Sequence, residues 1–351
     1  GFTTAVTGDQ LAVTVPPRRW DISIEADLIE EVARIYGYDN IPNTLPQAGN
    51  TIGELTPAQR LSREVRTTLE GAGLSEVISY SLTTAEKAVQ FTKLPVKQLT
   101  ALAMPMSEER STLRVNLISG LLDIVSYNLA RGNDRLALYE VGKVFATLGN
   151  ESDKRPTELP QVAFALTGKD YDFYAIKGII EALLLKFEQV RFEADDSIVE
   201  LHPGRTARIL IGETEVGFVG QVHPVIAKSY DISETYVANL DLTALLLKQP
   251  EQVIFTDIPK FQASKRDIAL LVDRTTTNQD ILDLIQGSKV KTLIKADLFD
   301  VYTGENVASD KKSLAYTLTF QSADKQLTDD EITAAVAKIT KNILASGAEI
   351  R

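Results

Sequence analysis

Residues 268–285 read IALLVDRTTTNQDILDLI, an apolar run followed by a polar turn and an amphipathic segment. The apolar run at 268–272 predicts a buried strand. Isoleucine and leucine then recur at helical spacing, so a helix is expected over residues 278–285. This strand and helix decide the fold of the last part of the chain.

The same patterns predict four further elements downstream of this pair. They are strands at residues 293–302 and 313–320, a helix at 332–344 and a short strand at 348–350. The order strand, helix, strand, strand, helix, strand is that of a ferredoxin-like domain. We expect this domain to occupy residues 251–351, since the pattern changes after Gln249 and Pro250.

The middle of the chain mixes helices with strands and predicts an α/β or α+β domain with a sizeable sheet over residues 57–250. Thr56 is a good N-cap and Pro57 suits the first helical position, so a helix should open the domain at 57–70. Further strands are expected at 76–82, 136–145, 162–166 and 207–211, and further helices at 117–130 and 176–187. Residues 45–56 contain glycine and proline between polar residues and predict a linker.

The first residues predict only the remnant of a small domain, over residues 1–44. Residues 3–6 and 11–15 alternate as in a β-hairpin, and a helix is expected at 26–36, ending at Gly37. A two-stranded hairpin is marginally stable alone. The expected fold class is therefore α+β multidomain, with a partial small N-terminal domain, a mixed α/β middle domain and a ferredoxin-like C-terminal domain.

The composition excludes several kinds of chemistry. The chain has 351 residues, no cysteine and two histidines, which excludes disulfides and thiolate zinc sites and leaves little for a serine triad. No apolar run approaches the ~18–20 residues of a membrane span, and no signal peptide is evident at the start, so we expect a cytoplasmic protein with no membrane partner.

The charge balance is uneven along the chain. The net charge of −11 argues against general binding to a phosphate backbone. Residues 253–351, however, hold 13 basic and 14 acidic residues, so their net charge is only −1. A polyanion would therefore dock at the C-terminal domain most easily.

Three carboxylates share one face of the first predicted helix. Asp27, Glu30 and Glu31 stand at positions i, i+3 and i+4, and Asp21 lies a short loop upstream. Hard cations such as Mg²⁺ prefer oxygen ligands of this kind. The alternative is that acids in a first helical turn complement the helix dipole and face water.

Two other groups of residues suit recognition of a nucleic acid. Arg18 and Arg19 adjoin Trp20, the only tryptophan, which could stack on a base or instead anchor a small core. Lys260, Lys265 and Arg266 precede the first strand of the last domain and would form a modest positive face if they share one sheet edge; solvated surface lysines are the alternative. No complete dinucleotide fingerprint or phosphate loop is present.

Several segments resemble the beta subunit of bacterial phenylalanyl-tRNA synthetase, and together they cover essentially the whole chain. The first are VPPRRWDI at 15–22 and DLIEEVARIYGY at 27–38. In the middle domain they are RSTLR at 110–114, YEVGKVF at 139–145 and HPGR at 202–205. In the last domain they are PKF at 259–261, KRDIA at 265–269, DVYTG at 300–304 and KKSL at 311–314.

The resemblance implies a role for each part of the chain. Residues 1–44 would be the C-terminal part of that family's fifth domain, which is metal-binding and resembles a DNA-binding fold. Residues 57–250 would have a class II synthetase-like fold without its catalytic site, and residues 251–351 would be the ferredoxin-fold anticodon-binding domain. The family's editing domain and its N-terminal tRNA-binding domain would lie outside this chain.

The resemblance also implies partners and ligands. The phenylalanine and ATP chemistry belongs to the family's alpha subunit, which pairs with beta in an α₂β₂ heterotetramer, and the beta subunit supplies contacts to tRNA(Phe). The family's Mg²⁺ positions, shared with alpha, fall on Asp21, Asp27, Glu30 and Glu31. The tRNA contacts expected in the last domain are Lys260, Phe261, Lys265, Arg266 and Tyr302.

Two other functions are compatible with the same residues. The chain could be a stand-alone module that binds RNA or protein through its ferredoxin-like domain, without a synthetase partner. It could also be an independent class II ligase, which requires an ATP-binding arginine pair, and Arg114 and Arg131 are loose candidates. Co-purification with an alpha-like partner, and an ATP–pyrophosphate exchange assay, would distinguish these functions.

Overall fold

The computed structural model describes residues 1–46, 49, 52–148, 155–248, 255, 257–305 and 307–351. The chain divides into two compact units, Gly1–Glu251 and Gln252–Arg351. Part of the linker predicted at residues 45–56 lies outside the described residues.

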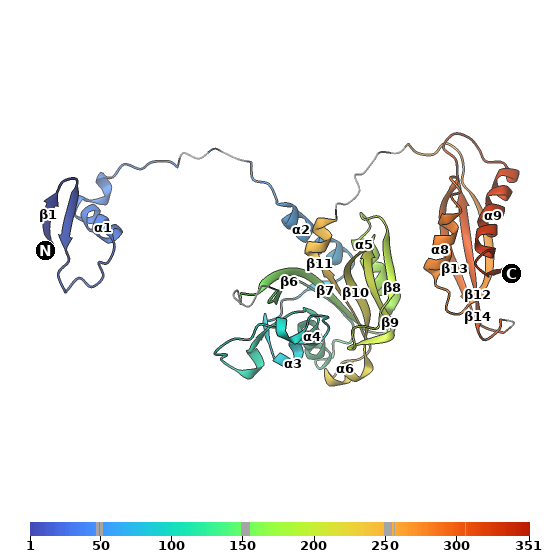
Figure 1. Cartoon of the computed structure of the whole chain (residues 1–351), viewed down its shortest axis with the longest axis horizontal. Helices are drawn as coiled ribbons and strands as arrows, with labels where there is room; N and C mark the ends of the chain where they lie inside the picture. Colours follow the sequence, from blue (N-terminus) through green and yellow to red (C-terminus); the bar gives the residue numbers. More distant parts are fainter. Residues whose placement is uncertain (47–48, 50–51, 149–154, 249–254, 256, 306) are drawn as a thin grey trace. The chain divides into compact units, whose positions relative to one another are not determined.

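The first part of the chain is a hairpin followed by a helix (Figure 1). Strands β1 (Thr3–Thr7) and β2 (Gln10–Thr14) pair around a two-residue turn in which Gly8 has a φ of 61°. Helix α1 (Glu25–Tyr36) follows and ends at Gly37, whose φ of 99° suits glycine. The predicted hairpin and helix are confirmed, but no residue of α1 is buried within the part of the chain that the structure describes.

A seven-stranded sheet with helices on both faces forms the middle part (Figure 1). The strand order is β3-β6-β7-β11-β10-β9-β8, and every neighbouring pair except β3 with β6 is antiparallel. The strands are β3 (Ser75–Glu76), β6 (Leu136–Ala146), β7 (Thr157–Thr167), β8 (Val190–Ala194), β9 (Leu201–Ile211), β10 (Thr214–Val222) and β11 (Thr235–Asp241).

Each face of this sheet has its own apolar core. One face packs against α2 (Pro57–Gly71), α5 (Phe173–Leu183) and α7 (Leu242–Leu247). The opposite face packs against α4 (Ile118–Leu129). The remaining short elements are β4 (Leu82–Thr83), α3 (Ala85–Ala88), β5 (Thr112–Leu113) and α6 (Pro224–Ser229).

Helix α2 begins as the sequence predicts. The Thr56 hydroxyl accepts a hydrogen bond from the Gln59 backbone N–H at 3.2 Å, and the Gln59 side chain accepts one from the Thr56 backbone N–H at 3.0 Å. This reciprocal pair satisfies N–H groups that a helix start leaves unpaired. Val65 and Leu69 then face the core.

The strand predicted at residues 76–82 is wrong over most of its length, because β3 ends at Glu76. Val77 still donates its N–H to the Tyr139 carbonyl at 2.8 Å, but Ser79 donates its N–H to the carboxylate of Glu140 at 3.2 Å. A side chain thus replaces the strand partner. Strands β8, β10 and β11, which the sequence patterns did not predict, complete the sheet.

The last unit is a four-stranded antiparallel sheet with two helices (Figure 1). Its elements are β12 (Ser264–Asp273), α8 (Asn278–Gly287), β13 (Leu293–Tyr302), β14 (Lys311–Phe320), α9 (Asp329–Leu344) and β15 (Glu349–Ile350). The strand order β13-β14-β12-β15 is that of a ferredoxin-like sheet. The predicted order of elements is therefore confirmed.

Candidate nucleic-acid interface and acidic cluster

The four-stranded sheet has one covered and one open face. Leu270, Tyr316 and Phe320 point to the side where α8 and α9 pack and form the core there. Alternate residues of the same strands point away from the helices. Within the residues that the structure describes, no helix covers this second face, which we call the open face.

The strand register places lysines at one end of the open face. Lys265 on β12 and Lys295 on β13 lie opposite Thr319 of β14, one on each side, so all three share a row across the sheet. The next row holds Asp267, Thr317 and Asp297, and the Thr317 hydroxyl donates to the Asp267 carboxylate at 2.6 Å. Acidic groups therefore follow the lysines, and the positive region is local.

Tyr302 lies at the other end of the open face. It pairs with Ser313, six residues along β14 from Thr319, or roughly 20 Å at strand spacing. Its hydroxyl donates to the Glu305 carbonyl at 3.0 Å, and the Arg351 guanidinium lies 5.5 Å from its ring centre. Tyr302 as a whole is 38% exposed, so part of the residue remains accessible.

The structure does not bring the three predicted cations Lys260, Lys265 and Arg266 onto one face. Arg266 follows Lys265 directly in a strand, so its side chain points to the helix side, where it pairs with Asp329 of α9 at 2.7 Å. Lys260 is exposed and precedes β12. Phe261 is half-buried, and its carbonyl accepts a hydrogen bond from the Gln321 side chain at 2.7 Å.

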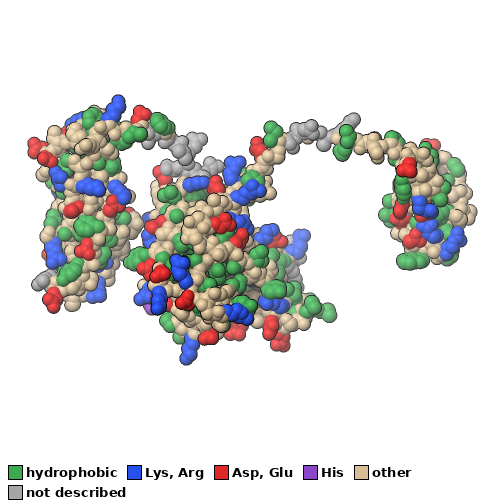
Figure 2. Space-filling model, turned by 180° about the vertical axis from the view of Figure 1, so that it is seen from behind, with side chains coloured by type: hydrophobic (Ala, Val, Ile, Leu, Met, Phe, Trp, Pro, Cys, Tyr) green, Lys and Arg blue, Asp and Glu red, His purple; other side chains and the backbone are tan. Residues whose placement is uncertain are grey.

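Sequence patterns missed Lys295. The residue stands in a predicted strand, but only the pairing with β14 shows that it shares a row with Lys265. Irregularities between Leu293 and Lys295 and between Leu298 and Asp300 shift the alternation along β13 twice, so counting residues from either end of the strand gives the wrong face for residues 295–298. Figure 2 shows lysine and arginine side chains mixed with acidic and apolar ones over the surface of this unit.

The four predicted metal ligands are held in three different ways. Arg19 lies between Asp21 and Glu31: its Nη2 is 2.7 Å from the Asp21 carboxylate and 3.0 Å from that of Glu31. Asp27 accepts hydrogen bonds from the backbone N–H groups of Ser23 at 2.7 Å and Ile24 at 2.9 Å, at the start of α1. Glu30 is exposed on the helix surface.

These hydrogen bonds lower the pKa values of three of the four carboxylates. Hydrogen bonds from Arg19 and then Arg34 lower the pKa of Glu31 to about 2, and the bond from Arg19 also lowers the pKa of Asp21. The backbone N–H groups of Ser23 and Ile24 lower the pKa of Asp27. Three of the four carboxylates are therefore stabilised in the ionised form by partners within the chain.

In this arrangement the four carboxylates do not form a Mg²⁺ site. Their oxygen chemistry suits the ion, but the guanidinium of Arg19 occupies the position between Asp21 and Glu31. Among the described residues, no three Asp, Glu, His or Cys side chains are placed to hold one metal ion.

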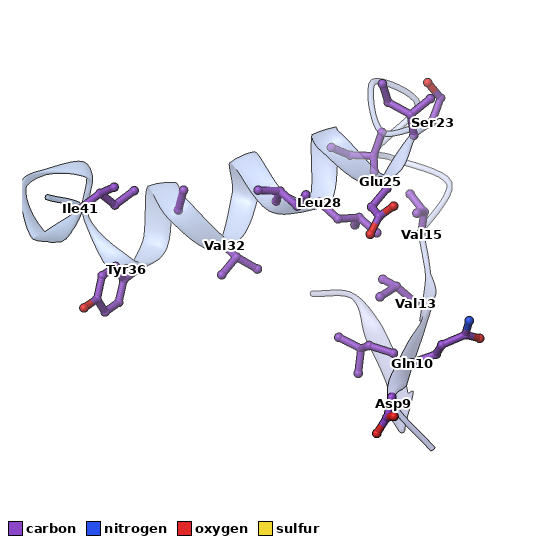
Figure 3. A pocket seen from close by; sticks show the side chains of 15 residues that line it. Asp9, Gln10, Val13, Val15, Ser23, Glu25, Leu28, Val32, Tyr36 and Ile41 are labelled. Carbon is purple, nitrogen blue, oxygen red and sulfur yellow. The ribbon is translucent and has the colours of Figure 1, made fainter. Parts of the chain in front are cut away.

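Of the two roles predicted for Trp20, stacking on a base or anchoring a small core, the structure contradicts the second. Its side chain is 89% exposed, and Val32 and Ile35 of α1 are 69% and 77% exposed. A hollow of about 980 Å³ separates the hairpin from α1. Figure 3 shows Val13 and Val15 on one wall of it and Leu28 and Val32 on the other. The apolar face of α1 is therefore not covered by the described residues.

The two arginines considered for an ATP site in the middle domain make contacts within the chain. Arg114 is buried and lies 2.7 Å from the carboxylate of Glu140, which is also buried, and it donates to the Lys143 carbonyl at 2.9 Å. Arg131 lies over the Tyr127 ring at 3.4 Å and donates to the Tyr127 carbonyl. His202 lies near the start of β9, and its ring Nδ1 accepts a hydrogen bond from the Gly204 N–H at 3.1 Å.

Three family models match the chain in sequence order. They are the tRNA synthetase B5 domain over residues 1–38, the phenylalanyl tRNA synthetase beta chain CLM domain over residues 41–242 and the ferredoxin-fold anticodon binding domain over residues 259–351. The three matches, with the α+β folds described above, define a chain of the tRNA synthetase class. The second model covers more than half of the residues, and the chain belongs to the family of phenylalanyl-tRNA synthetase beta chains.

Curated relatives agree with this family. The chain is 53% identical over 357 residues to the phenylalanine–tRNA ligase beta subunit of Lactococcus lactis subsp. lactis, covering 98% of this chain and 44% of the relative. It is 50% identical over 364 residues to that of Streptococcus agalactiae serotype Ia, covering 100% of this chain and 45% of the relative. The chain therefore spans less than half of the length of these relatives.

Solved structures give a weaker resemblance. Two structures of pyrrolysyl-tRNA synthetase from Desulfitobacterium hafniense match 54% of this chain with a TM-score of 0.44, at 15% and 14% identity, and 65% and 68% of those chains are covered. The family assignment rests on the sequence models and not on this resemblance. No described helix combines the length and the apolar character needed to cross a membrane.

Proposed function

We propose that this chain is a non-catalytic portion of the beta subunit of phenylalanine–tRNA ligase. It would support assembly with the catalytic alpha subunit in a cytoplasmic α₂β₂ enzyme and bind the anticodon arm of tRNA(Phe) during ATP-dependent aminoacylation. The observation that carries this proposal is the match of residues 259–351 to an anticodon binding domain, next to identity of 50% or more with beta subunits. The domain boundaries proposed are 1–44, a linker at 45–56, 57–250 and 251–351.

The packing of the middle domain supports the non-catalytic part of the proposal. Arg114 and Glu140 form an ion pair in the protein interior. The Ser79 hydroxyl donates a hydrogen bond to the second carboxylate oxygen of Glu140 at 2.6 Å. An arginine that grips a nucleotide must keep its N–H donors directed at the ligand. The donors of Arg114 are instead directed at Ser79, Glu140 and Lys143.

The isolated chain is expected to show no ATP–pyrophosphate exchange with phenylalanine and to form a stable complex with the ligase alpha subunit. Exchange is measured with the chain alone, with alpha alone and with the mixture, and complex formation is followed by size-exclusion chromatography with light scattering. Exchange by the pure chain would indicate an independent ligase. If the chain binds tRNA but never associates with alpha, it is a stand-alone module.

We also propose that Asp21, Asp27, Glu30 and Glu31 contribute to a Mg²⁺ ion shared with alpha in the assembled enzyme. The proposal rests on the family resemblance, because these side chains do not form a complete site by themselves. If it is right, Glu30→Gln combined with Asp21→Asn should raise the Mg²⁺ concentration at which the complex with alpha is half-assembled. Gln279→Ala, on the surface of α8, is the control. A Mg²⁺ requirement that is the same in all three chains would contradict the proposal.

In the last domain we propose that the anticodon arm contacts the open face. Lys265 and Lys295 would meet phosphates at one end, and Tyr302 would stack on an unpaired base at the other, since single-stranded RNA is bound by basic grooves and aromatic platforms. Lys260, Phe261 and Arg266 lie outside these two rows, and a contact from them stays a separate prediction.

A further inference from the structure

A groove lies between three helices on one face of the seven-stranded sheet. Its lining comes from α2, from α5 with the residues that follow it, and from α7 with the residue after its end. Its volume is about 580 Å³, within the ~300–1,000 Å³ range of small-molecule pockets. The groove is therefore large enough for a small organic molecule.

The walls of this groove are aliphatic and reachable from solvent. Leu246 of α7 is 39% exposed, and Leu185, which follows α5, is 84% exposed. Leu61 and Leu183 are half-buried in the same lining, and Phe187 is the single aromatic residue among the described ones. Exposed apolar side chains gathered in a hollow are typical of a binding site. Because the walls are mostly leucine, they suit a flexible hydrocarbon chain better than a planar ring.

The lining has a net positive charge although the chain is acidic. It holds three basic residues, Arg60, Lys186 and Lys248, and one acidic residue, Glu64, so its net charge is +2, whereas the whole chain carries −11. Lys186 Nζ lies 3.0 Å from the Glu64 carboxylate, which compensates its charge. Among the described residues, none forms a hydrogen bond or an ion pair with the side chain of Arg60 or Lys248. These two cations are therefore available to a ligand.

The two available cations belong to the same part of the groove, where α2 contacts α7. Leu61 and Leu246 line this groove and also a second hollow, so these two leucines are close in space. Arg60 directly precedes Leu61, and Lys248 lies two residues after Leu246. The groove is therefore amphipathic, with cations near the contact of the two helices and apolar walls beside them.

We propose that this groove binds a small aliphatic carboxylate, of the medium-chain fatty acid class. The carboxylate would bind Arg60 and Lys248, and the hydrocarbon chain would cover Leu185 and Leu246. The net charge of the lining would repel a cationic amphiphile, and an anion without an apolar part would leave the leucines exposed to water. Binding needs neither tRNA nor the alpha subunit, so its outcome is independent of the proposed function.

The test titrates the full chain with sodium octanoate and measures the heat of binding by calorimetry. Saturable binding at a single site is expected. Each additional CH₂ group should tighten binding about threefold, because more apolar surface leaves water. Decanoate should therefore bind more tightly than octanoate, and hexanoate more weakly.

Two kinds of variant test the cations and the apolar wall separately. Arg60→Gln combined with Lys248→Gln should weaken octanoate binding about tenfold, since an exposed ion pair contributes up to about fivefold in affinity. Neither residue is buried, so the melting temperature without octanoate should stay unchanged. Lys169→Gln combined with Lys228→Gln removes the same charge from exposed positions outside the groove and should bind octanoate as the wild type does. Leu246→Asn should also weaken binding, through the loss of apolar contact.

Octylamine separates recognition of the carboxylate from simple apolar adsorption, because it has the same chain with the opposite charge and should bind more weakly than octanoate. Three results would overturn the proposal: no saturable binding of octanoate, equal binding of octylamine and octanoate, or equal affinity in the wild type and in the variant that lacks Arg60 and Lys248. An equal loss in the control variant would also overturn it, since the effect would then arise from net charge alone. If Leu246→Asn does not fold, the charge variants decide the outcome.

Discussion

Replacing Arg114 by methionine is expected to lower the free energy of unfolding of the middle domain by about 3–5 kcal/mol, the usual cost of removing one partner from a buried ion pair. Glu140 is only 2% exposed, so its charge cannot be solvated once the guanidinium is gone. The cost arises from this stranded carboxylate more than from the lost attraction. Urea unfolding of the full chain, monitored by circular dichroism, measures the change in the free energy of unfolding.

The double variant Arg114→Met with Glu140→Met distinguishes this explanation from a simple loss of packing. Removing both charges should recover part of the stability lost in the single variant, while the hydroxyl and N–H of Ser79 lose their acceptor. Arg131→Met is the matched control, since Arg131 lies on the surface against Tyr127 and should change stability by less than about 1 kcal/mol. Wild-type stability in Arg114→Met would show that the pair is not needed to hold residues 77–79 on the sheet.

Removing Lys265 and Lys295 together is expected to weaken binding of tRNA(Phe) by the assembled enzyme roughly tenfold. Each exposed ion pair with a phosphate contributes up to about 1 kcal/mol, and each lost phosphate contact lowers the slope of log affinity against log salt by about 0.7–1. The double alanine variant should therefore lower that slope by about 1.5–2. Filter binding across a salt series measures both quantities.

A charge-matched variant shows whether the position of the lysines matters. Lys338 and Lys341 lie on α9, on the covered side of the sheet. Their double replacement by alanine removes the same charge from the side opposite the open face. It should leave the affinity and the salt slope almost unchanged. An unchanged slope after loss of Lys265 and Lys295, or a larger loss in Arg266→Ala, would show that the RNA does not lie on the open face.

Local patterns were sufficient for the longer helices and for the order of elements in the last domain, but they did not predict the short helices α3, α6 and α7. Apolar periodicity and capping residues act within a few residues of the chain, and Thr56 with Gln59 shows this directly, because both partners of the cap lie within four positions. The ends of strands were harder to predict from local patterns. Nothing near Ser79 in the sequence indicates that Glu140, 61 residues away, takes its N–H and ends the strand.

The candidate sites likewise depend partly on local sequence and partly on contacts between residues far apart in the chain. The sequence by itself determined which residue types are present: four carboxylates around the first helix, a group of cations near the first strand of the last domain, and no cysteine. Only the tertiary structure decided that Arg19 lies between Asp21 and Glu31, and that Lys265 shares a row with Lys295 instead of a face with Arg266. Composition and local spacing are set by neighbours along the chain, whereas strand register and burial depend on pairings between residues far apart in sequence.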